Sequence, residues 1–203
     1  MRESPAALAR SELIVGGQKS GKSHRAEYLA RQWLAQSSDH RVVFIVTARA
    51  DADADADDEM DARIARHRSD RAQRLPEARV VEEPLELSGA IREHGEAKRL
   101  VVVDCLTLWL TNLVWPDHTV PSLEAPALRD AAPAIAALLG ALDHAPGPCV
   151  LVSNEIGMGV IPMGRPVRAF CDALGLLNQQ VAERCERVTL MAAGLPLSLK
   201  GGL

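Results

Sequence analysis

The sequence predicts an α/β fold in which a mostly parallel central sheet carries helices on both faces. Short apolar runs rich in branched residues recur along the chain, at 13–15, 42–46, 100–103, 149–152 and 188–191. Stretches long enough for a helix separate them, and this alternation is typical of parallel strands buried on both faces. The 203 residues, 47% of them hydrophobic, suffice for one domain with a core of ordinary size.

The first predicted strand leads directly into a glycine-rich turn with the spacing G-x-x-x-x-G-K-S. The turn comprises Gly16, Gly17, Gln18, Lys19, Ser20, Gly21, Lys22 and Ser23. In such a P-loop successive backbone N–H groups point at phosphate oxygens, and the following helix adds positive potential. Lys22 would reach the β and γ phosphates of ATP or GTP, and the Ser23 hydroxyl would bind Mg²⁺. The alternative is a glycine turn that binds nothing, but every fixed position of the motif is filled.

We expect a single P-loop nucleotide-binding domain over residues 1–203, with two parts outside its core. Residues 1–11 are predicted to form a disordered tail. Residues 50–58 are mostly alternating Asp and Ala, and repulsion between the carboxylates favours a solvated loop inserted after the second strand. Helices are predicted at 20–35, after the P-loop, and at 58–71, after the acidic loop.

The second of these helices contains His67, the most notable of the six histidines. Four arginines would lie one helical turn away or next to it in sequence, namely Arg63, Arg66, Arg68 and Arg71. Nearby cations disfavour imidazolium, so we expect a lowered pKa and a ring nitrogen free to attack phosphorus. The alternative is a solvated helix whose arginines pair with Glu59 and Asp70, and spacing alone favours that alternative.

The third predicted strand ends in a carboxylate, Asp104. An acidic residue at this place lies beside the P-loop at the carboxyl edge of the sheet and holds Mg²⁺ or its waters. The competing interpretation is an N-cap for a helix that starts near Cys105. Further along, apolar residues recur at three- and four-residue steps over 165–185, which predicts a long helix with one face in the core.

Charge and cysteine content exclude several classes of protein. A formal charge of −4 and a pI near 5.9 argue against nucleic acid or an anionic membrane as the main partner. The cysteines, Cys105, Cys149, Cys171 and Cys185, form no C-x-x-C pair, which predicts reduced thiols and a cytoplasmic location. Asp104 and Asn112 interrupt the longest apolar run, at 100–115, so no membrane span is expected.

Four segments taken together carry a resemblance to a known family. They are the P-loop; residues 57–60 followed by Arg63, Ile64 and His67; residues 104–109 with Asn112 and Leu113; and residues 154–162. Further matches are Arg165, Arg168, Phe170, Asp172, Gly175, Asn178, Gln179, Gly194 and Lys200. In this order and spacing the chain resembles the bifunctional adenosylcobinamide kinase/adenosylcobinamide-phosphate guanylyltransferases of cobalamin biosynthesis, over residues 12 to 200.

The resemblance implies that the chain phosphorylates the aminopropanol hydroxyl of adenosylcobinamide with ATP or GTP. It then implies transfer of GMP from GTP to the phosphorylated product through a guanylylated histidine, giving adenosylcobinamide-GDP. His67 matches that histidine, so the nucleophile interpretation becomes the favoured one, with Lys22 as the second catalytic residue. A RecA-like P-loop fold and a homotrimer are implied as well.

The same matching implies which residues contact GTP. Besides the P-loop these are Thr47, Ala48, Arg49, Arg68, Ser69, Asp70, Arg71, Glu82 and Asp104. The chain departs from the family pattern at Gln18, Lys19, Leu75 and Cys171.

Two other functions remain open from the sequence. A generic P-loop small-molecule kinase would share the P-loop, Mg²⁺ and the fold, without needing His67 or a second reaction with guanine nucleotide. A regulatory nucleotide switch or motor subunit would share the fold as well, because P-loop scaffolds host many unrelated activities. The matches far from the P-loop argue against both.

Overall fold

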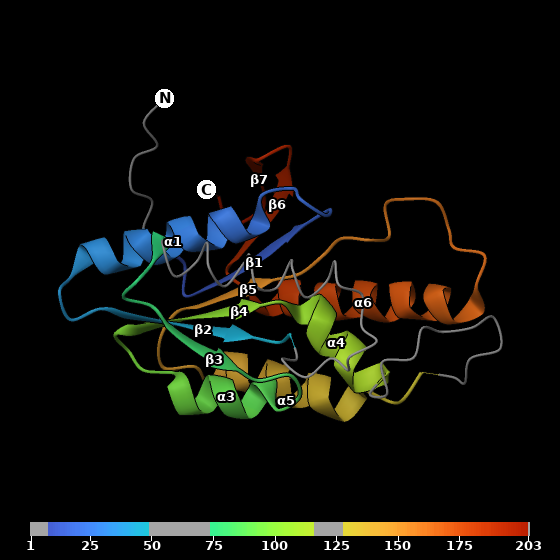
Figure 1. The fold of residues 1–203 in the computed structure, drawn as a ribbon, viewed down its shortest axis with the longest axis horizontal. Helices are drawn as coiled ribbons and strands as arrows, with labels where there is room; N and C mark the ends of the chain where they lie inside the picture. The colour runs from blue at the N-terminus through green and yellow to red at the C-terminus, as the bar shows by residue number, and fades with distance from the viewer. Residues whose placement is uncertain (1–7, 49–73, 116–127, 203) are drawn as a thin grey trace.

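A computed structural model of the chain describes residues 8–48, 74–115 and 128–202, in which seven strands form one sheet (Figure 1). The strands are β1 Ser11–Gly16, β2 Arg41–Val46, β3 Arg79–Glu82, β4 Arg99–Asp104, β5 Cys149–Val152, β6 Arg187–Ala192 and β7 Leu195–Lys200. Their order across the sheet is β3-β2-β4-β5-β1-β6-β7. Every neighbouring pair is parallel except β6 and β7, which are antiparallel. The prediction of a mostly parallel sheet is confirmed.

Helices cover both faces of this sheet, as predicted. They are α1 Lys22–Gln36, α3 Leu87–His94, α4 Leu106–Val114, α5 Ala132–Asp143 and α6 Arg165–Arg184. In Figure 1, α1 lies above the sheet, while α3 and α5 lie below it with α4 and α6 toward the right-hand end. Among the described residues no helix combines the length and hydrophobicity needed to cross a membrane.

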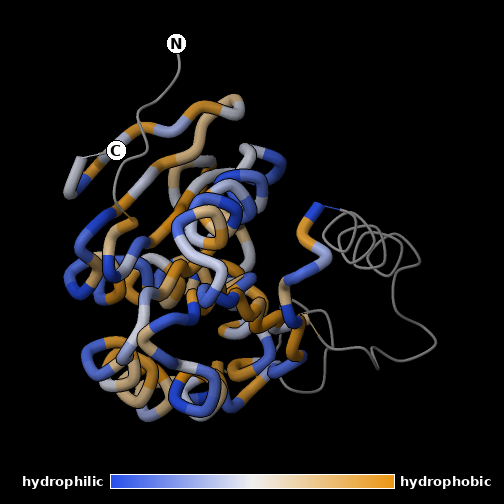
Figure 2. The backbone as a smooth tube through the Cα atoms, turned by 90° about the vertical axis from the view of Figure 1, so that its left-hand side faces the viewer, coloured by the Kyte–Doolittle hydropathy of each residue, from blue (hydrophilic) through white to orange (hydrophobic). Residues whose placement is uncertain are grey.

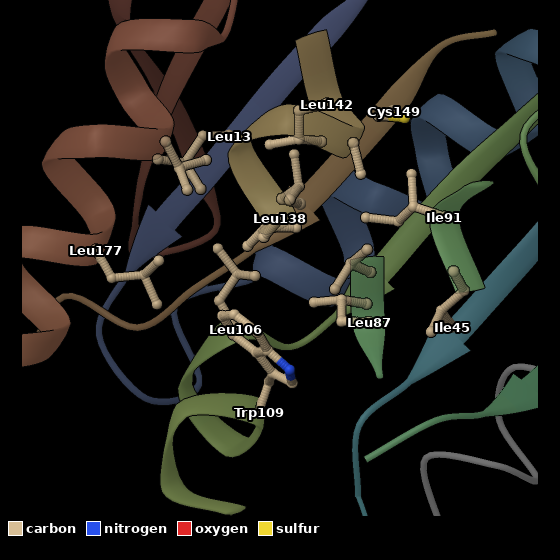
Figure 3. Close-up of a cluster of buried hydrophobic side chains, with 14 of the residues drawn as sticks. Leu13, Ile45, Leu87, Ile91, Leu106, Trp109, Leu138, Leu142, Cys149 and Leu177 are labelled. Atoms are coloured by element: carbon tan, nitrogen blue, oxygen red, sulfur yellow. The ribbon is translucent and has the colours of Figure 1, made fainter. Parts of the chain in front are cut away.

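The core consists of two hydrophobic layers, one on each face of the sheet. Alternate residues of the strands divide between them: Leu13 and Val15 pack with α3 to α6, and Ile14 packs with α1. Figure 3 shows part of the larger layer, where Leu138 of α5 lies between Leu142 of the same helix and Leu106 of α4. Figure 2 shows several hydrophobic segments in the middle of the molecule.

All five predicted strands are present, but β3 and β7 were not predicted. Both are edge strands with mostly exposed side chains, so neither has the continuous apolar run of a strand buried on both faces. The helices predicted at 20–35 and 165–185 correspond to α1 and α6. The predicted helix at 58–71 and the acidic loop at 50–58 lie outside the described residues.

The predicted disordered tail was placed too far into the chain. Ser11 already begins β1, and the backbone N–H of Arg10 donates a hydrogen bond to Glu186 Oε2 at 2.8 Å. The Arg10 guanidinium also donates to the carbonyl oxygen of Ala145 at 3.3 Å. The polar character of residues 10–12 hides these contacts in the sequence, because their partners lie far along the chain.

A cluster of buried charged residues links the start of β1 to α1 and β6. Glu12 of β1 is 1% exposed, and its carboxylate lies 3.5 Å from Arg25 Nε of α1 and 3.4 Å from Arg187 Nη1 of β6. The Thr189 hydroxyl donates to the same carboxylate at 2.8 Å. Because a buried carboxylate is costly without partners, this group fixes α1 and β6 relative to β1.

Candidate nucleotide site

The P-loop has the backbone conformation that its glycines predict. Gly16 has φ 154° and Gly21 has φ 103°, values that residues with a side chain rarely adopt. A Cβ on Gly16 would lie 2.5 Å from the carbonyl oxygen of Met191, so the close approach of β6 also requires glycine there. At Gly17, by contrast, a Cβ would meet no atom within 4 Å. Only some of the glycines are therefore sterically required.

Lys22 is buried inside the turn with its ammonium group held by backbone. Its Nζ donates to the carbonyl oxygen of Gly16 at 3.0 Å and to that of Gly17 at 2.7 Å. Gln18 and Lys19, at the tip of the loop, are exposed. The arrangement fixes one positive charge at the first turn of α1, where anions already bind favourably.

Two neighbouring segments hold the P-loop in place. The backbone N–H of Glu155, just after β5, donates to the Gly16 carbonyl oxygen at 3.1 Å. On the other side, the backbone N–H of Gly194, in the turn between β6 and β7, donates to the Ser20 carbonyl oxygen at 3.0 Å. The loop is thus supported from both flanks of β1.

Asp104 ends β4 at the same edge of the sheet as the P-loop. It is paired in register with Val46 of β2 and Val152 of β5, and it is partly exposed. The N-cap interpretation is wrong, because Cys105 occupies the N-cap position of α4 and no side chain caps this helix. The metal interpretation of this carboxylate stays a prediction.

The charges of Asp104 and Lys22 both affect the pKa of the Cys105 thiol. Desolvation raises the pKa of Cys105 to about 11, the Asp104 carboxylate adds to the rise, and Lys22 opposes it. The thiol therefore stays protonated at neutral pH and is a poor nucleophile. No disulfide joins the four cysteines, all of which lie in the described part of the chain.

Other predicted contact residues lie at the ends of the neighbouring strands. Thr47 follows β2 and is 0% exposed, and Ala48 beside it is partly exposed. Glu82 ends β3 in register with Val46, and its side chain is exposed. The structure thus brings Thr47, Glu82 and Asp104 to one edge of three adjacent strands.

The remaining predicted site residues lie outside the described part of the chain. They are His67, Arg49, Arg68, Ser69, Asp70 and Arg71. Their roles stay predictions.

Several polar residues at this edge received no role from the sequence. The Thr107 hydroxyl accepts a hydrogen bond from the backbone N–H of Asn154 at 2.9 Å, and Asn178 Nδ2 donates to the Asn154 carbonyl oxygen at 3.0 Å. Asn112 is 4% exposed within the apolar helix α4. The available signal was an amide side chain in a largely apolar helix, because such a side chain is buried only with a hydrogen-bonding partner.

An exposed apolar segment, residues 156–163, follows Glu155 directly. Met158 is 78% exposed, Val160 95%, Ile161 75% and Met163 91%. The far end is fixed by Arg168, whose Nη1 donates to the carbonyl oxygens of Pro162 at 2.9 Å and Met163 at 2.6 Å. Exposed apolar residues clustered at one place are typical of a binding surface. Figure 1 shows this segment running from β5 to the start of α6.

A separate hollow of about 620 Å³ lies between α4, α5 and α6. Its lining is largely aliphatic, with Leu110, Leu139 and Leu177 among the side chains, and contains no P-loop residue. Because the P-loop does not line it, this hollow is distinct from the candidate nucleotide site.

Comparison with known proteins identifies the family. A model of the family described as cobinamide kinase / cobinamide phosphate guanyltransferase matches residues 12–199. The chain is 46% identical over 190 residues to the bifunctional adenosylcobalamin biosynthesis protein CobP of Pseudomonas aeruginosa, covering 94% of this chain and 97% of that protein. It is 34% identical over 192 residues to the bifunctional adenosylcobalamin biosynthesis protein CobU of Escherichia coli, covering 93% and 98%. The resemblance is confirmed, and the chain belongs to the cobinamide kinase / cobinamide phosphate guanyltransferase family, whose fold is that of a P-loop NTPase.

Proposed function

We propose that this chain phosphorylates adenosylcobinamide with ATP or GTP and then transfers GMP from GTP to adenosylcobinamide phosphate, giving adenosylcobinamide-GDP. The observation that carries the proposal is the placement of a buried Lys22 and a partly exposed Asp104 at one edge of the sheet, in a chain of this family. A nucleoside triphosphate is the ligand that such a pair recognises.

In the kinase reaction the chain mainly positions and neutralises charge. The N–H groups of the P-loop bind the β and γ phosphates, and Lys22 balances charge on the transferred phosphoryl group while the acceptor hydroxyl attacks in line. Ser23 and Asp104 are partly exposed oxygen donors at the same edge, a donor set that suits Mg²⁺. When bound there, Mg²⁺ supplies further neutralisation of the phosphate oxygens.

In the second reaction His67 is the nucleophile. Its neutral ring nitrogen attacks the α-phosphorus of GTP, forming an N–P bond while pyrophosphate leaves. A phosphate oxygen of adenosylcobinamide phosphate then attacks the same phosphorus and releases the histidine. We assign guanine-nucleotide contacts in this step to Ala48, Arg49 and Glu82, together with residues 68–71 that follow His67.

The acceptor must reach the P-loop from the carboxyl edge of the sheet. The 156–163 segment lies there, joined to the P-loop through the Glu155 to Gly16 hydrogen bond. We assign this segment to the corrinoid, because its aliphatic and thioether side chains suit a large, partly apolar ring whose reactive arm points at the phosphates. The family resemblance further supports a homotrimer, and the cysteine pattern supports a cytoplasmic location.

Radioactive GTP tests the two-step reaction. With α-labelled GTP the protein should retain acid-labile, alkali-stable label, as expected for a phosphoramidate, and His67→Ala should abolish it while sparing kinase turnover. Lys22→Met should abolish phosphorylation of adenosylcobinamide as well. Label that survives His67→Ala would remove the role of this histidine.

Mass spectrometry of the reaction products distinguishes the proposed function from a generic small-molecule kinase. Incubation with adenosylcobinamide, ATP and GTP should give both the phosphorylated and the GDP-linked product. Turnover of other small alcohols, with no corrinoid product, would favour the generic kinase instead.

A further inference from the structure

Thr47 uses its polar groups within the protein. Its backbone N–H donates to the carbonyl oxygen of Asp104 at 3.1 Å, and its hydroxyl donates to the carbonyl oxygen of Cys105 at 2.7 Å. The same hydroxyl oxygen accepts from the Cys105 N–H at 3.0 Å. Both donors of this residue are thus committed to the backbone of the last residue of β4 and of the residue after it.

The carbonyl group of Thr47 is held in its turn by Asn112. The amide Nδ2 of this buried residue donates to the Thr47 carbonyl oxygen at 2.8 Å and to the Pro84 carbonyl oxygen at 3.2 Å. Trp109, one turn earlier on α4, donates from Nε1 to the Leu85 carbonyl oxygen at 2.9 Å. One helix therefore fixes the chain after β2 and the chain after β3.

These contacts exclude Thr47 as a phosphate ligand through its side chain. The side chain is 0% exposed, and phosphate oxygens need donors, whereas only acceptor lone pairs of Thr47 remain. The hydroxyl contacts the peptide group that joins Asp104 to α4, and that peptide sets where the Asp104 side chain projects.

We propose that Thr47 and Asn112 are positioning residues, which hold the Asp104 carboxylate and the ends of β2 and β3 in the geometry that the bound nucleotide and Mg²⁺ require. This inference rests on the proposed function, in which Asp104 faces the metal. It differs from the role implied by the family resemblance, in which Thr47 contacts GTP.

Nucleotide affinity, measured by calorimetry with Mg²⁺ and again in EDTA, tests the inference. Thr47→Val keeps the shape and removes the hydroxyl. We expect GTP affinity to fall about tenfold with Mg²⁺ and to stay within about twofold in EDTA, because only the placement of Asp104 changes. The kcat of the kinase reaction should fall about 10- to 100-fold. Thr47→Ser, which keeps the hydroxyl, should restore both quantities.

Asn112→Asp replaces the amide donor with an oxygen at nearly constant shape. It should lower GTP affinity in both conditions and more with Mg²⁺, because a carboxylate oxygen cannot donate to the Thr47 and Pro84 carbonyl oxygens, so the ends of β2 and β3 and, through Thr47, the Asp104 carboxylate lose support. The matched control is Thr189→Val, which removes another fully buried threonine hydroxyl at a distance from Asp104. It should lower the melting temperature and leave the ratio of the two affinities unchanged.

Three results would overturn the inference. The first is an equal loss of GTP affinity with and without Mg²⁺ in Thr47→Val, which indicates a direct contact. The second is no loss of affinity in either condition. The third is the same ratio of the two affinities in Thr189→Val as in Thr47→Val, which indicates general destabilisation. A wild-type protein that binds GTP but yields no corrinoid product would remove the proposed function and leave this comparison valid.

Discussion

The backbone N–H of Gly194 donates a hydrogen bond to the carbonyl oxygen of Ser20 at 3.0 Å, so the turn between β6 and β7 supports the P-loop. Ala193 and Gly194 both have positive φ, 51° and 80°, as in the two-residue turns that suit the twist of a hairpin. A Cβ on Gly21 would lie 3.2 Å from Gly194 Cα. The shape of the phosphate site therefore depends on a hairpin near the end of the chain.

Replacing Gly16 or Gly17 of the P-loop with alanine should lower stability and nucleotide binding to different extents. Gly16→Ala places a Cβ 2.5 Å from the Met191 carbonyl oxygen at φ 154°, so β6 or the loop must shift. We expect a loss of at least about 2 kcal/mol in the free energy of unfolding and little nucleotide binding. Gly17→Ala meets no neighbouring atom within 4 Å and should change either quantity by little. Urea unfolding and nucleotide titration measure both; equal effects would contradict the assigned geometry.

Loss of the charge on Glu12 should destabilise the fold strongly. In Glu12→Gln the buried guanidinium groups of Arg25 and Arg187 lose the Glu12 carboxylate. Breaking a buried ion pair from one side costs about 3–5 kcal/mol, which urea unfolding would detect. Asp39→Asn is the comparison: its pair with Lys98 is about two-thirds exposed on both sides and is worth at most about 1 kcal/mol. Similar losses in the two variants would show that Glu12 is not held as described.

Alkaline pH should weaken the fold through its buried thiols. Burial raises the pKa of Cys149 from 9.0 to about 12, so folding favours the protonated thiol. This contribution is present below pH 9.0 and is lost as the pH rises toward about 12. Cys149→Ala should melt at a lower temperature than wild type at pH 7. Its melting temperature should then fall less than that of wild type when the pH is raised to 11. A decline as steep as that of wild type would contradict the assignment.

Polar substitutions in the 156–163 segment should weaken binding of the corrinoid substrate and leave nucleotide binding unchanged. Val160→Ser and Ile161→Ser exchange side chains that are 95% and 75% exposed, so the fold should tolerate both changes. We expect KM for adenosylcobinamide to rise about 10-fold or more while KM for nucleotide stays unchanged. Lys98→Ser is a surface control with no expected effect on either. A change of oligomeric state with an unchanged corrinoid KM would assign the segment to a second copy of the chain instead.

Guanylyl transfer should decline on acidification more steeply than phosphorylation. Protonation removes the lone pair that His67 needs for attack, whereas the kinase reaction uses no histidine. Single-turnover labelling with α-labelled GTP across pH 5 to 8, beside the kinase rate, makes the comparison. Parallel profiles would argue against a histidine nucleophile.

The phosphate site could be predicted because its signals are local. Gly16, Gly21 and Lys22 lie within one turn, and the conformations of these glycines follow from their lack of a Cβ. The strand at Asp104 was equally visible, since a run buried on both faces is apolar throughout. The edge strands β3 and β7 were missed because exposed strands carry no such run.

The sequence alone thus determined the α/β class, the P-loop and the carboxylate that follows the third apolar run, because each depends on neighbouring residues. Only the tertiary structure decided which strand ends meet. Asn112 contacts the Thr47 carbonyl group 65 residues away, and Gly194 reaches Ser20 across the β1 and β6 pairing. Such contacts depend on the order of the strands in the sheet, which results from packing of the whole chain and leaves no periodic pattern in the sequence.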